Sequence, residues 1–275
     1  MRLVKLIALM LVLLAGPPLE AQAALLFAVN EGSSSSLDAL FRQDKYADLA
    51  NALSDAIGQR VKIETSNILP SLIRNVERQR YDVLFVRPSH ISAQAMRDHG
   101  YRLLVVARGE AKVHFIVRAD SPLKTLQDIH GRRIVFPNRD AYPTQIGQAM
   151  LRDAGLDLKK ENVQYLDRQE AVGYTIEEKI ADVGVIVSYS KVGKGWLKAG
   201  GRFLATKEKL PYWSVIVSPK VGQATVQKLK KALTGLELSA AGQDILQKIG
   251  VTGFADGEQQ DFIDMLDWVE GRHGR

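Results

Sequence analysis

The stretch IVFPNRDAYPTQIGQAML (residues 134–151) begins as an apolar strand, passes through a polar turn and continues as an amphipathic helix. The turn carries Asp140, Tyr142 and Thr144. In open α/β sheets, small ligands bind just beyond the carboxyl ends of the strands, which is where turns of this kind lie. We therefore predict a ligand site here, with Thr144 as a hydrogen-bond donor, Asp140 as an acceptor and Tyr142 as an aromatic wall.

The same alternation of strands and helices continues along the chain on both sides of this stretch. Apolar or alternating segments predict strands at 25–30, 60–66, 81–88, 101–108, 112–119, 132–136, 162–166, 182–188, 202–208 and 212–219. Apolar residues at helical spacing predict helices at 37–58, 69–80, 89–100, 144–155, 168–181, 224–236, 240–250 and 257–271. This order indicates an α/β fold with mainly parallel sheets and helices on both faces.

Two lobes fit this pattern better than one wide sheet. A second series of strands and helices begins at KVHFIVRA (112–119), and the last helices can pack on the first lobe if the chain returns through YWSVIVSP (212–219). We therefore expect lobe 1 to comprise residues 24–110 and 216–275 and lobe 2 to comprise residues 111–215, joined by two crossovers that act as a hinge. Strand ends of both lobes would then face a shared cleft.

The N-terminus has the three parts of a secretory signal peptide. Arg2 and Lys5 supply positive charge, LIALMLVLLAG (6–16) is apolar but too short to span a bilayer, and AQA (21–23) is a cleavage signature. We expect cleavage after residue 23 and a periplasmic mature protein; an uncleaved anchor is the alternative. The chain has no cysteine, which excludes disulfides, thiolate metal sites and the anchor of a bacterial lipoprotein.

Charge and motif content narrow the class of function. The formal net charge of +6 suits an anionic ligand, a nucleic acid or a membrane surface. The export signal and the scattered basic residues argue against nucleic acid. The five histidines fall in no metal-binding spacing, and no nucleophile elbow or phosphate-binding loop occurs. We therefore expect a binding protein rather than an enzyme, with no metal and no cofactor.

Three further junctions between a strand and a helix carry polar side chains. In chain order the candidates are Ser34 and Ser35, then Arg87, Ser89 and His90, and finally Ser188. The serine loop either binds an anion at a helix N-terminus or simply caps that helix. Arg87 either grips an oxyanion or carboxylate, or pairs with an acid across the cleft. Four such junctions from two lobes, converging on one cleft, describe a binding site.

The chain resembles the periplasmic phosphate-, phosphite- and phosphonate-binding proteins of ABC transporters. The matching segments are KYADLANALSDAIG (45–58), YDVLFVRPSHISAQA (81–95), SPLKTLQDIHGRRIVF (121–136), MLRDAGLDL (150–158), IADVGVIVSYS (180–190), LPYWSVIVSP (210–219) and AAGQDILQKIGVTGFADGEQQDFIDML (240–266). They occur in the family's order and cover nearly all of the mature chain. The resemblance implies a type II periplasmic binding protein fold.

The departures from the family lie in the pocket. Family members have a tyrosine where Leu69 stands, a glycine where Arg87 stands, and an oxyanion-gripping serine–threonine turn where PNRDAYP (137–143) stands. The family's histidine aligns near Gln169, which the resemblance adds to the site. A phosphonate dianion would be repelled by an unneutralised Asp140, so this side chain must pair with a cation, accept from a ligand donor or point away.

We therefore expect a periplasmic solute-binding protein that captures a small polar or anionic ligand between its lobes. The ligand would be an oxyanion, a phosphorus ester or a zwitterion, delivered to the permease of an ABC transporter. The alternative is a ligand-sensing protein that signals to a membrane receptor such as a histidine kinase. In either case we expect a monomer that binds no nucleic acid.

Overall fold

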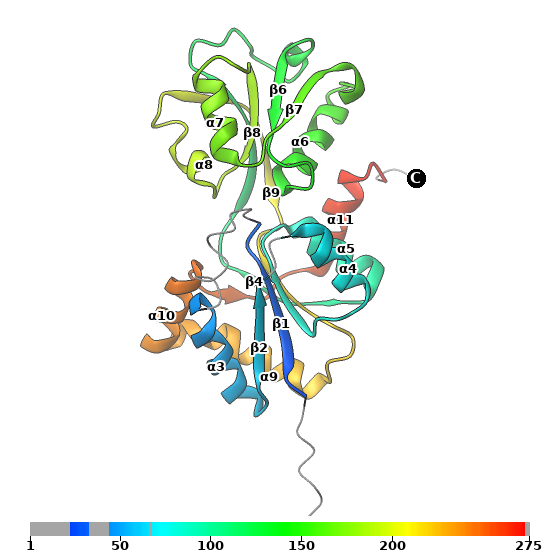
Figure 1. Cartoon of the computed structure of the whole chain (residues 1–275), viewed down its shortest axis with the longest axis vertical. Coiled ribbons are helices and arrows are strands. Elements are labelled where there is room, and N and C mark those ends of the chain that lie inside the picture. Colours follow the sequence, from blue (N-terminus) through cyan, green and yellow to red (C-terminus); the bar gives the residue numbers. More distant parts are fainter. Residues whose placement is uncertain (1–22, 33–43, 66–67, 273–275) are drawn as a thin grey trace, which may run out of the picture.

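The computed structural model describes residues 23–32, 44–65 and 68–272. Within these ranges the chain forms two β-sheets, each covered by helices on both faces, and the two layered bodies stack end to end in an elongated molecule (Figure 1). The signal peptide expected at 1–23, apart from its last residue, and the candidates Ser34 and Ser35 lie outside the described residues. The α/β fold with two lobes is confirmed.

The first sheet has the described strands in the order β11-β4-β10-β3-β1-β2. These strands are β1 (Leu25–Asn30), β2 (Val61–Thr65), β3 (Val83–Val86), β4 (Arg102–Ala107), β10 (Ser214–Val217) and β11 (Phe254–Ala255). The uninterrupted apolar run VLFV forms the central strand β3, which is buried on both faces. Because side chains alternate along a strand, Phe27 of β1 faces one helical layer and Ala28 faces the other.

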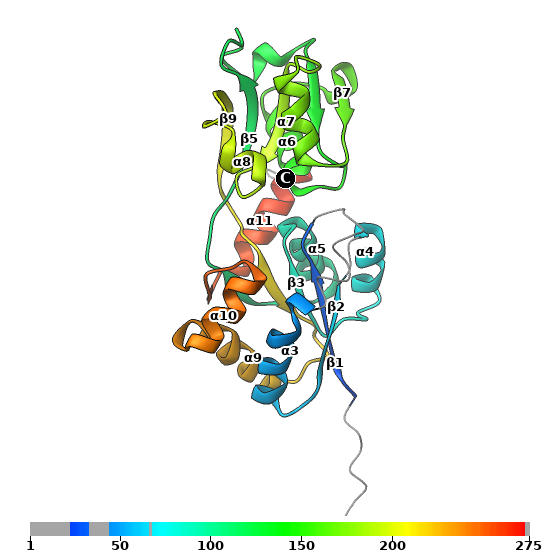
Figure 2. The ribbon, with the colours of Figure 1, turned by 60° about the vertical axis from the view of Figure 1, so that its left-hand side comes forward.

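The helices of this lobe divide between the two faces of the sheet (Figure 2). One face carries α3 (Ala47–Ile57), α9 (Gln223–Gly235), the short 3-10 helix η3 (Leu236–Leu238) and α10 (Ala240–Ile249). The opposite face carries α4 (Leu69–Glu77), α5 (Ser89–His99) and α11 (Gln259–Val269). Across the described ranges no helix has the length and apolar character needed to cross a membrane.

The second sheet has the order β7-β6-β8-β5-β9. Its strands are β5 (Ala111–Arg118), β6 (Arg133–Phe136), β7 (Asn162–Tyr165), β8 (Val183–Val187) and β9 (Gly201–Leu210). Helix α6 (Tyr142–Asp153) covers one face, while α7 (Gln169–Glu177) and α8 (Lys191–Gly195) cover the other. Two 3-10 turns, η1 (Gln127–Ile129) and η2 (Leu158–Lys160), connect these elements.

Both sheets are mixed, which corrects the expectation of mainly parallel sheets. Strands β1, β2 and β3 are parallel, as are β6, β7 and β8. The strands next to a crossover cause the difference, because β10 runs antiparallel to β3 and β4, and β5 runs antiparallel to β8 and β9. The chain passes between the sheets at 108–110 and again at 211–213.

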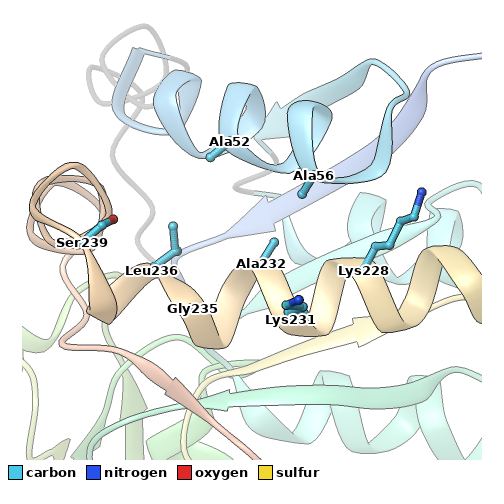
Figure 3. A pocket seen from close by; sticks show the side chains of 8 residues that line it. All are labelled: Ala52, Ala56, Lys228, Lys231, Ala232, Gly235, Leu236 and Ser239. Carbon is cyan, nitrogen blue, oxygen red and sulfur yellow. The ribbon is translucent and has the colours of Figure 1, made fainter.

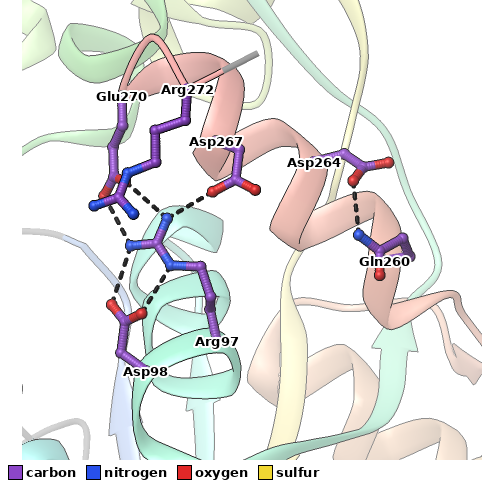
Figure 4. Close-up of polar contacts among 7 residues, drawn as sticks. All are labelled: Arg97, Asp98, Gln260, Asp264, Asp267, Glu270 and Arg272. Carbon is purple, nitrogen blue, oxygen red and sulfur yellow. Dashed lines mark hydrogen bonds and ion pairs between the residues drawn. The ribbon is translucent and has the colours of Figure 1, made fainter. Parts of the chain in front are cut away.

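Helix α11 is held to its own lobe by an ion-pair cluster (Figure 4). Arg97 of α5 donates from Nη1 to Asp267 at 2.8 Å and to Glu270 at 2.7 Å. A second guanidinium, that of Arg272, contacts the same Glu270 carboxylate at 2.7 Å. The last turn of α11 is therefore fixed against α5.

The same turn also contacts the other lobe. Arg152 of α6 donates to the carbonyls of Trp268 at 2.7 Å and Val269 at 2.9 Å, and Trp268 Nε1 donates to Asp153 at 2.6 Å. A guanidinium at the C-terminal end of a helix satisfies carbonyls that have no partner within the helix. We call this contact the C-terminal latch, because it joins the lobes at a point other than the two crossovers.

Close packing inside the second lobe can be tested at Gly184 of β8. A Cβ atom there would lie 2.7 Å from Val172 Cγ1 and 3.1 Å from Ile116 Cγ1. We expect Gly184→Ala to lower the free energy of unfolding in urea by about 1–3 kcal/mol, because an overpacked core must shift. Gly195→Ala is the matched control, since no atom lies within 4 Å of its Cβ position. Equal stability of the two variants would contradict the packing described for β8.

Candidate functional site

Five segments bring polar and aromatic side chains together between the lobes. Two follow β1 and β3 of the first sheet, two lie at the start of α6 and after β8 in the second lobe, and the fifth is the crossover at 211–213. We call the side chains involved the interlobe cluster; they are Glu31, Arg87, His90, Tyr142, Tyr189, Tyr212 and Trp213.

A partly buried ion pair lies at the centre of this cluster. Strands β1 and β3 pair in parallel with Asn30 opposite Val86, which places Glu31 and Arg87 at neighbouring strand ends. Arg87 Nη2 donates to Glu31 Oε1 at 3.0 Å. Of the two alternatives for Arg87, the structure shows pairing with an acid, but that acid belongs to its own lobe. The guanidinium Nε remains without a partner.

Glu31 receives further donors from the segment before α3. Lys45 Nζ lies 2.5 Å and the Tyr46 hydroxyl 2.6 Å from Glu31 Oε1. Burial acts to raise the pKa of Glu31, but the Arg87 charge and the hydrogen bonds from Lys45 and Tyr46 outweigh it and hold the pKa below its usual value. Two cations therefore surround one ionised carboxylate, which leaves a local excess of positive charge.

An aromatic wall covers the other side of Arg87. The guanidinium carbon lies 4.1 Å from the centroid of the Trp213 ring, which is an arrangement for a cation–π contact. Tyr212 stacks on Trp213 at 4.5 Å, and Tyr189 meets Trp213 edge-on at 5.1 Å. Since Tyr189 follows β8, this wall joins the second lobe to the crossover. Burial raises the pKa of Tyr189 to about 12.

A second aromatic contact crosses directly between the lobes. His90 of α5 and Tyr142 of α6 are stacked with their ring planes 2° apart and their centroids 5.8 Å apart. Both are buried, with 8% and 2% of their surface exposed. Burial lowers the pKa of His90 to about 4, against the opposing effect of a hydrogen bond to the Asp140 backbone. The imidazole is therefore neutral at physiological pH.

The crossover between these contacts is held by hydroxyl groups. Ser89 Oγ donates to the carbonyls of Pro211 at 2.9 Å and Tyr212 at 3.1 Å. The Tyr142 hydroxyl donates to the Pro211 carbonyl at 3.3 Å. Ser89 was predicted as a ligand-binding residue, and its hydroxyl instead holds the crossover that carries the aromatic wall.

Three buried side-chain nitrogens of the described residues lack a hydrogen-bond partner, and all three belong to the interlobe cluster. They are Arg87 Nε, His90 Nδ1 and Trp213 Nε1. Trp213 lies close to the Tyr189 hydroxyl and opposes the rise in the pKa of Tyr189. Trp213 Nε1 nevertheless forms no hydrogen bond of regular geometry. Buried polar atoms are normally satisfied. The cluster can therefore supply donors to a ligand rich in acceptor atoms.

Three other candidates use their side chains within the second lobe. Thr144 Oγ1 donates to the carbonyls of Pro137 at 3.2 Å and Asn138 at 2.9 Å. Gln169 Oε1 accepts from the Val187 amide at 2.8 Å, and Ser188 Oγ accepts from the Lys112 amide at 3.1 Å. Each of these side chains closes a turn or joins neighbouring elements.

Asp140 is connected to the cluster through its backbone. Its side chain is exposed, and its amide donates to Asn138 Oδ1 at 3.0 Å. The group that meets His90 is the Asp140 backbone and not the carboxylate. The structure therefore brings together Arg87, Ser89, His90, Tyr142 and the backbone at residue 140.

The sequence interpretation missed four members of the cluster. Glu31 directly follows the first strand, and Tyr189 lies inside the junction that supplied Ser188. Tyr212 and Trp213 belong to the second crossover and open the segment 212–219 through which the chain was expected to return. An aromatic pair in a hinge segment is the signal that could have found the last two.

Other parts of the described chain are weaker candidates for a functional site than the interlobe cluster. No group of three or more potential metal ligands occurs among these residues. A shallow cavity of about 490 Å³ lies between α3 and α9, on the outer side of the first lobe (Figure 3). Small side chains such as Ala52 and Ala232 line it together with Lys228 and Lys231. None of the unpartnered buried nitrogens faces this cavity, so the interlobe cluster is the better candidate.

Comparison with known proteins agrees with the fold and identifies a family. Residues 39–262 match the family described as ABC transporter, phosphonate, periplasmic substrate-binding protein. No curated protein sequence matches the chain significantly.

Several solved structures share the fold at low sequence identity. XAC2383 from Xanthomonas citri, bound to ATP, is 13% identical with a TM-score of 0.76, covering 92% of this chain and 99% of that one. PhnD1 from Prochlorococcus marinus, in complex with methylphosphonate, is 13% identical with a TM-score of 0.72, covering 91% and 99%. The aliphatic sulphonate-binding protein SsuA from Escherichia coli is 16% identical with a TM-score of 0.55, covering 89% and 83%. The fold is that of the type II periplasmic binding proteins.

The neutral His90 makes stability depend on pH. Above about pH 6.5 neither the folded nor the unfolded state protonates this residue; below that value the unfolded state takes up the proton first, so stability falls as the pH approaches 4. The wild-type protein should lose free energy of unfolding between pH 7 and pH 4.5, and we expect His90→Gln to make this loss smaller by about 2–3 kcal/mol. Urea unfolding of both proteins at pH 7 and pH 4.5 measures it. A wild-type pH slope in the variant would show that His90 is not a buried neutral group.

Proposed function

Because the chain belongs to the family of periplasmic phosphonate-binding proteins of ABC transporters, we propose that it captures a small anionic ligand between its lobes and delivers it to a membrane permease. Members of this family are binding proteins of transporters and not enzymes. In this proposal the segment 1–23 is removed on export, and the mature protein acts in the periplasm as a monomer.

The observation that carries the proposal is the group of unpartnered nitrogens at the interlobe cluster. Arg87 Nε and Trp213 Nε1 can only donate hydrogen bonds, and an anion supplies acceptors for both. The excess positive charge beside Glu31 favours the same class of ligand. The similar structures that hold ATP and methylphosphonate also bind anions, which agrees with this choice.

Ligand capture would couple to the relative motion of the lobes. We take residues 24–110 with 216–275 and residues 111–215 as the two bodies that close on the ligand. Arg87 comes from the first body, Tyr189 from the second and Trp213 from the crossover, so a ligand that contacts all three binds the closed form best. Such a ligand shifts the population toward closure by hinge motion at 108–110 and 211–213.

The proposal is tested by a calorimetric binding screen with phosphate, phosphite, methylphosphonate, sulfate and amino acids. We expect at least one anion to bind, and Arg87→Ala to weaken that binding by about 10–100-fold, because a charge-assisted hydrogen bond is lost. Arg78→Ala is the matched control; Arg78 is exposed at the end of α4, so the affinity should stay the same.

Arg87→Lys separates loss of binding from loss of folding. This variant keeps the positive charge beside Glu31 while removing the planar Nε donor, so it should fold and still bind more weakly than the wild type. Full affinity in a folded Arg87→Lys or Arg87→Ala protein would refute the role of Arg87. Failure of every anion to bind the wild type would refute the proposed function.

A further inference from the structure

The stacked pair of His90 and Tyr142 has an unusual origin. The two rings come from opposite lobes, yet their planes differ by only 2°. Each ring is buried, and each is attached to the first turn of a helix, α5 or α6, which holds its backbone firmly. When the lobes separate, these rings therefore become the two facing walls of a narrow slot.

The slot suits a flat group better than a bulky one. Aromatic rings stack at centroid separations from about 4.5 Å. The two rings are now stacked on each other with 5.8 Å between their centroids, so a planar group that stacks on both must move them to roughly 9 Å apart, which separation of the lobes would have to supply. The Tyr142 hydroxyl already has a partner in the Pro211 carbonyl, which leaves the ring face as the surface it offers. The imidazole of His90 is uncharged, so stacking requires no desolvation of a charge.

The slot and the anion donors come from directly connected segments. Arg87 and His90 are separated by one turn of chain, and Ser89 between them is bonded to the crossover that carries Trp213. The wall formed by Trp213 is not an alternative platform, because Arg87 and Tyr212 already lie against this ring. The remaining unpartnered atom, His90 Nδ1, is buried and can bond a substituent of a flat group that stacks on this ring.

We propose that the ligand is an organic anion with a flat aromatic group: its anionic end binds Arg87 Nε and Trp213 Nε1, and its ring enters between His90 and Tyr142. This inference rests on the proposed function and specifies its ligand. A bare inorganic oxyanion would fill only the donor end and leave the two rings in contact with each other. Aryl phosphonates, aryl sulfonates and nucleotides belong to the predicted class.

Matched ligands test the slot by calorimetry on the full mature protein. The first set is methylphosphonate, cyclohexylphosphonate and phenylphosphonate, and the second is methanesulfonate and benzenesulfonate. Within each set the anionic end is constant. We expect the phenyl compound to bind at least about tenfold more tightly than the methyl and the cyclohexyl compound, because only a flat ring can stack on both walls.

Substitutions of His90 and Tyr142 test whether these two rings cause the preference for phenyl ligands. Tyr142→Leu and His90→Leu should each reduce the preference for phenyl over methyl to less than about threefold, measured as the ratio of the two affinities within each variant. Tyr142→Phe keeps the ring and should keep the preference, which also controls for folding.

Each outcome decides between the two proposals. Equal affinity for phenyl- and methylphosphonate, or for phenyl- and cyclohexylphosphonate, would overturn the slot while leaving an anion site intact. Retention of the phenyl preference in both leucine variants would place the ring elsewhere and also overturn it. If none of the five anions binds while phosphate, phosphite or sulfate does, the inference fails and the proposed function stands; if those anions do not bind either, both fail.

Discussion

The partly buried pair of Glu31 and Arg87 is the interaction on which the interlobe cluster depends. Removal of one residue would leave the other charge partly buried without its partner, so each stabilises the other in this position. Parallel pairing of β1 and β3 supplies the geometry, because it sets the two strand ends side by side. The position of Arg87 then determines where the Trp213 ring can stack and how the crossover must run.

The same pair decides the polarity of the site. Glu31 has only acceptor atoms, and Lys45, Tyr46 and Arg87 all direct donors to it. The groups that remain available to a ligand are therefore hydrogen-bond donors, namely Arg87 Nε and Trp213 Nε1. A site that contains a carboxylate can thus still be a site for an anion, because the carboxylate has already been neutralised by groups of its own lobe.

The sequence predicted the helices and strands well where the pattern of apolar residues matches the faces that are buried in the fold. The run VLFV was predicted to be a buried strand and forms one, and Arg87 at its end belongs to the interlobe cluster. Strand direction was not predictable, since β10 pairs antiparallel with β3 only because the chain returns from the second lobe.

Site residues were harder to predict because tertiary contacts decide their role. Thr144, Gln169 and Ser188 occupy strand ends, as ligand residues do, but short polar side chains at these positions also satisfy the backbone of turns. Nothing in local pattern separates these two uses. Trp213 acquires its role from Arg87, which is distant in the sequence, and no periodicity encodes that contact.

The place of β10 in the first sheet has a consequence for how the protein folds. This strand lies between β3 and β4, although the whole second sheet is encoded before it. Until residues 214–217 arrive, β4 lacks its neighbour and β3 has an open edge, and pairing over such sequence distances is slow. Open edges invite association with other chains. The strands β1 to β4 therefore form no complete sheet by themselves, and their protection from association depends on β10, which is encoded after the whole second sheet.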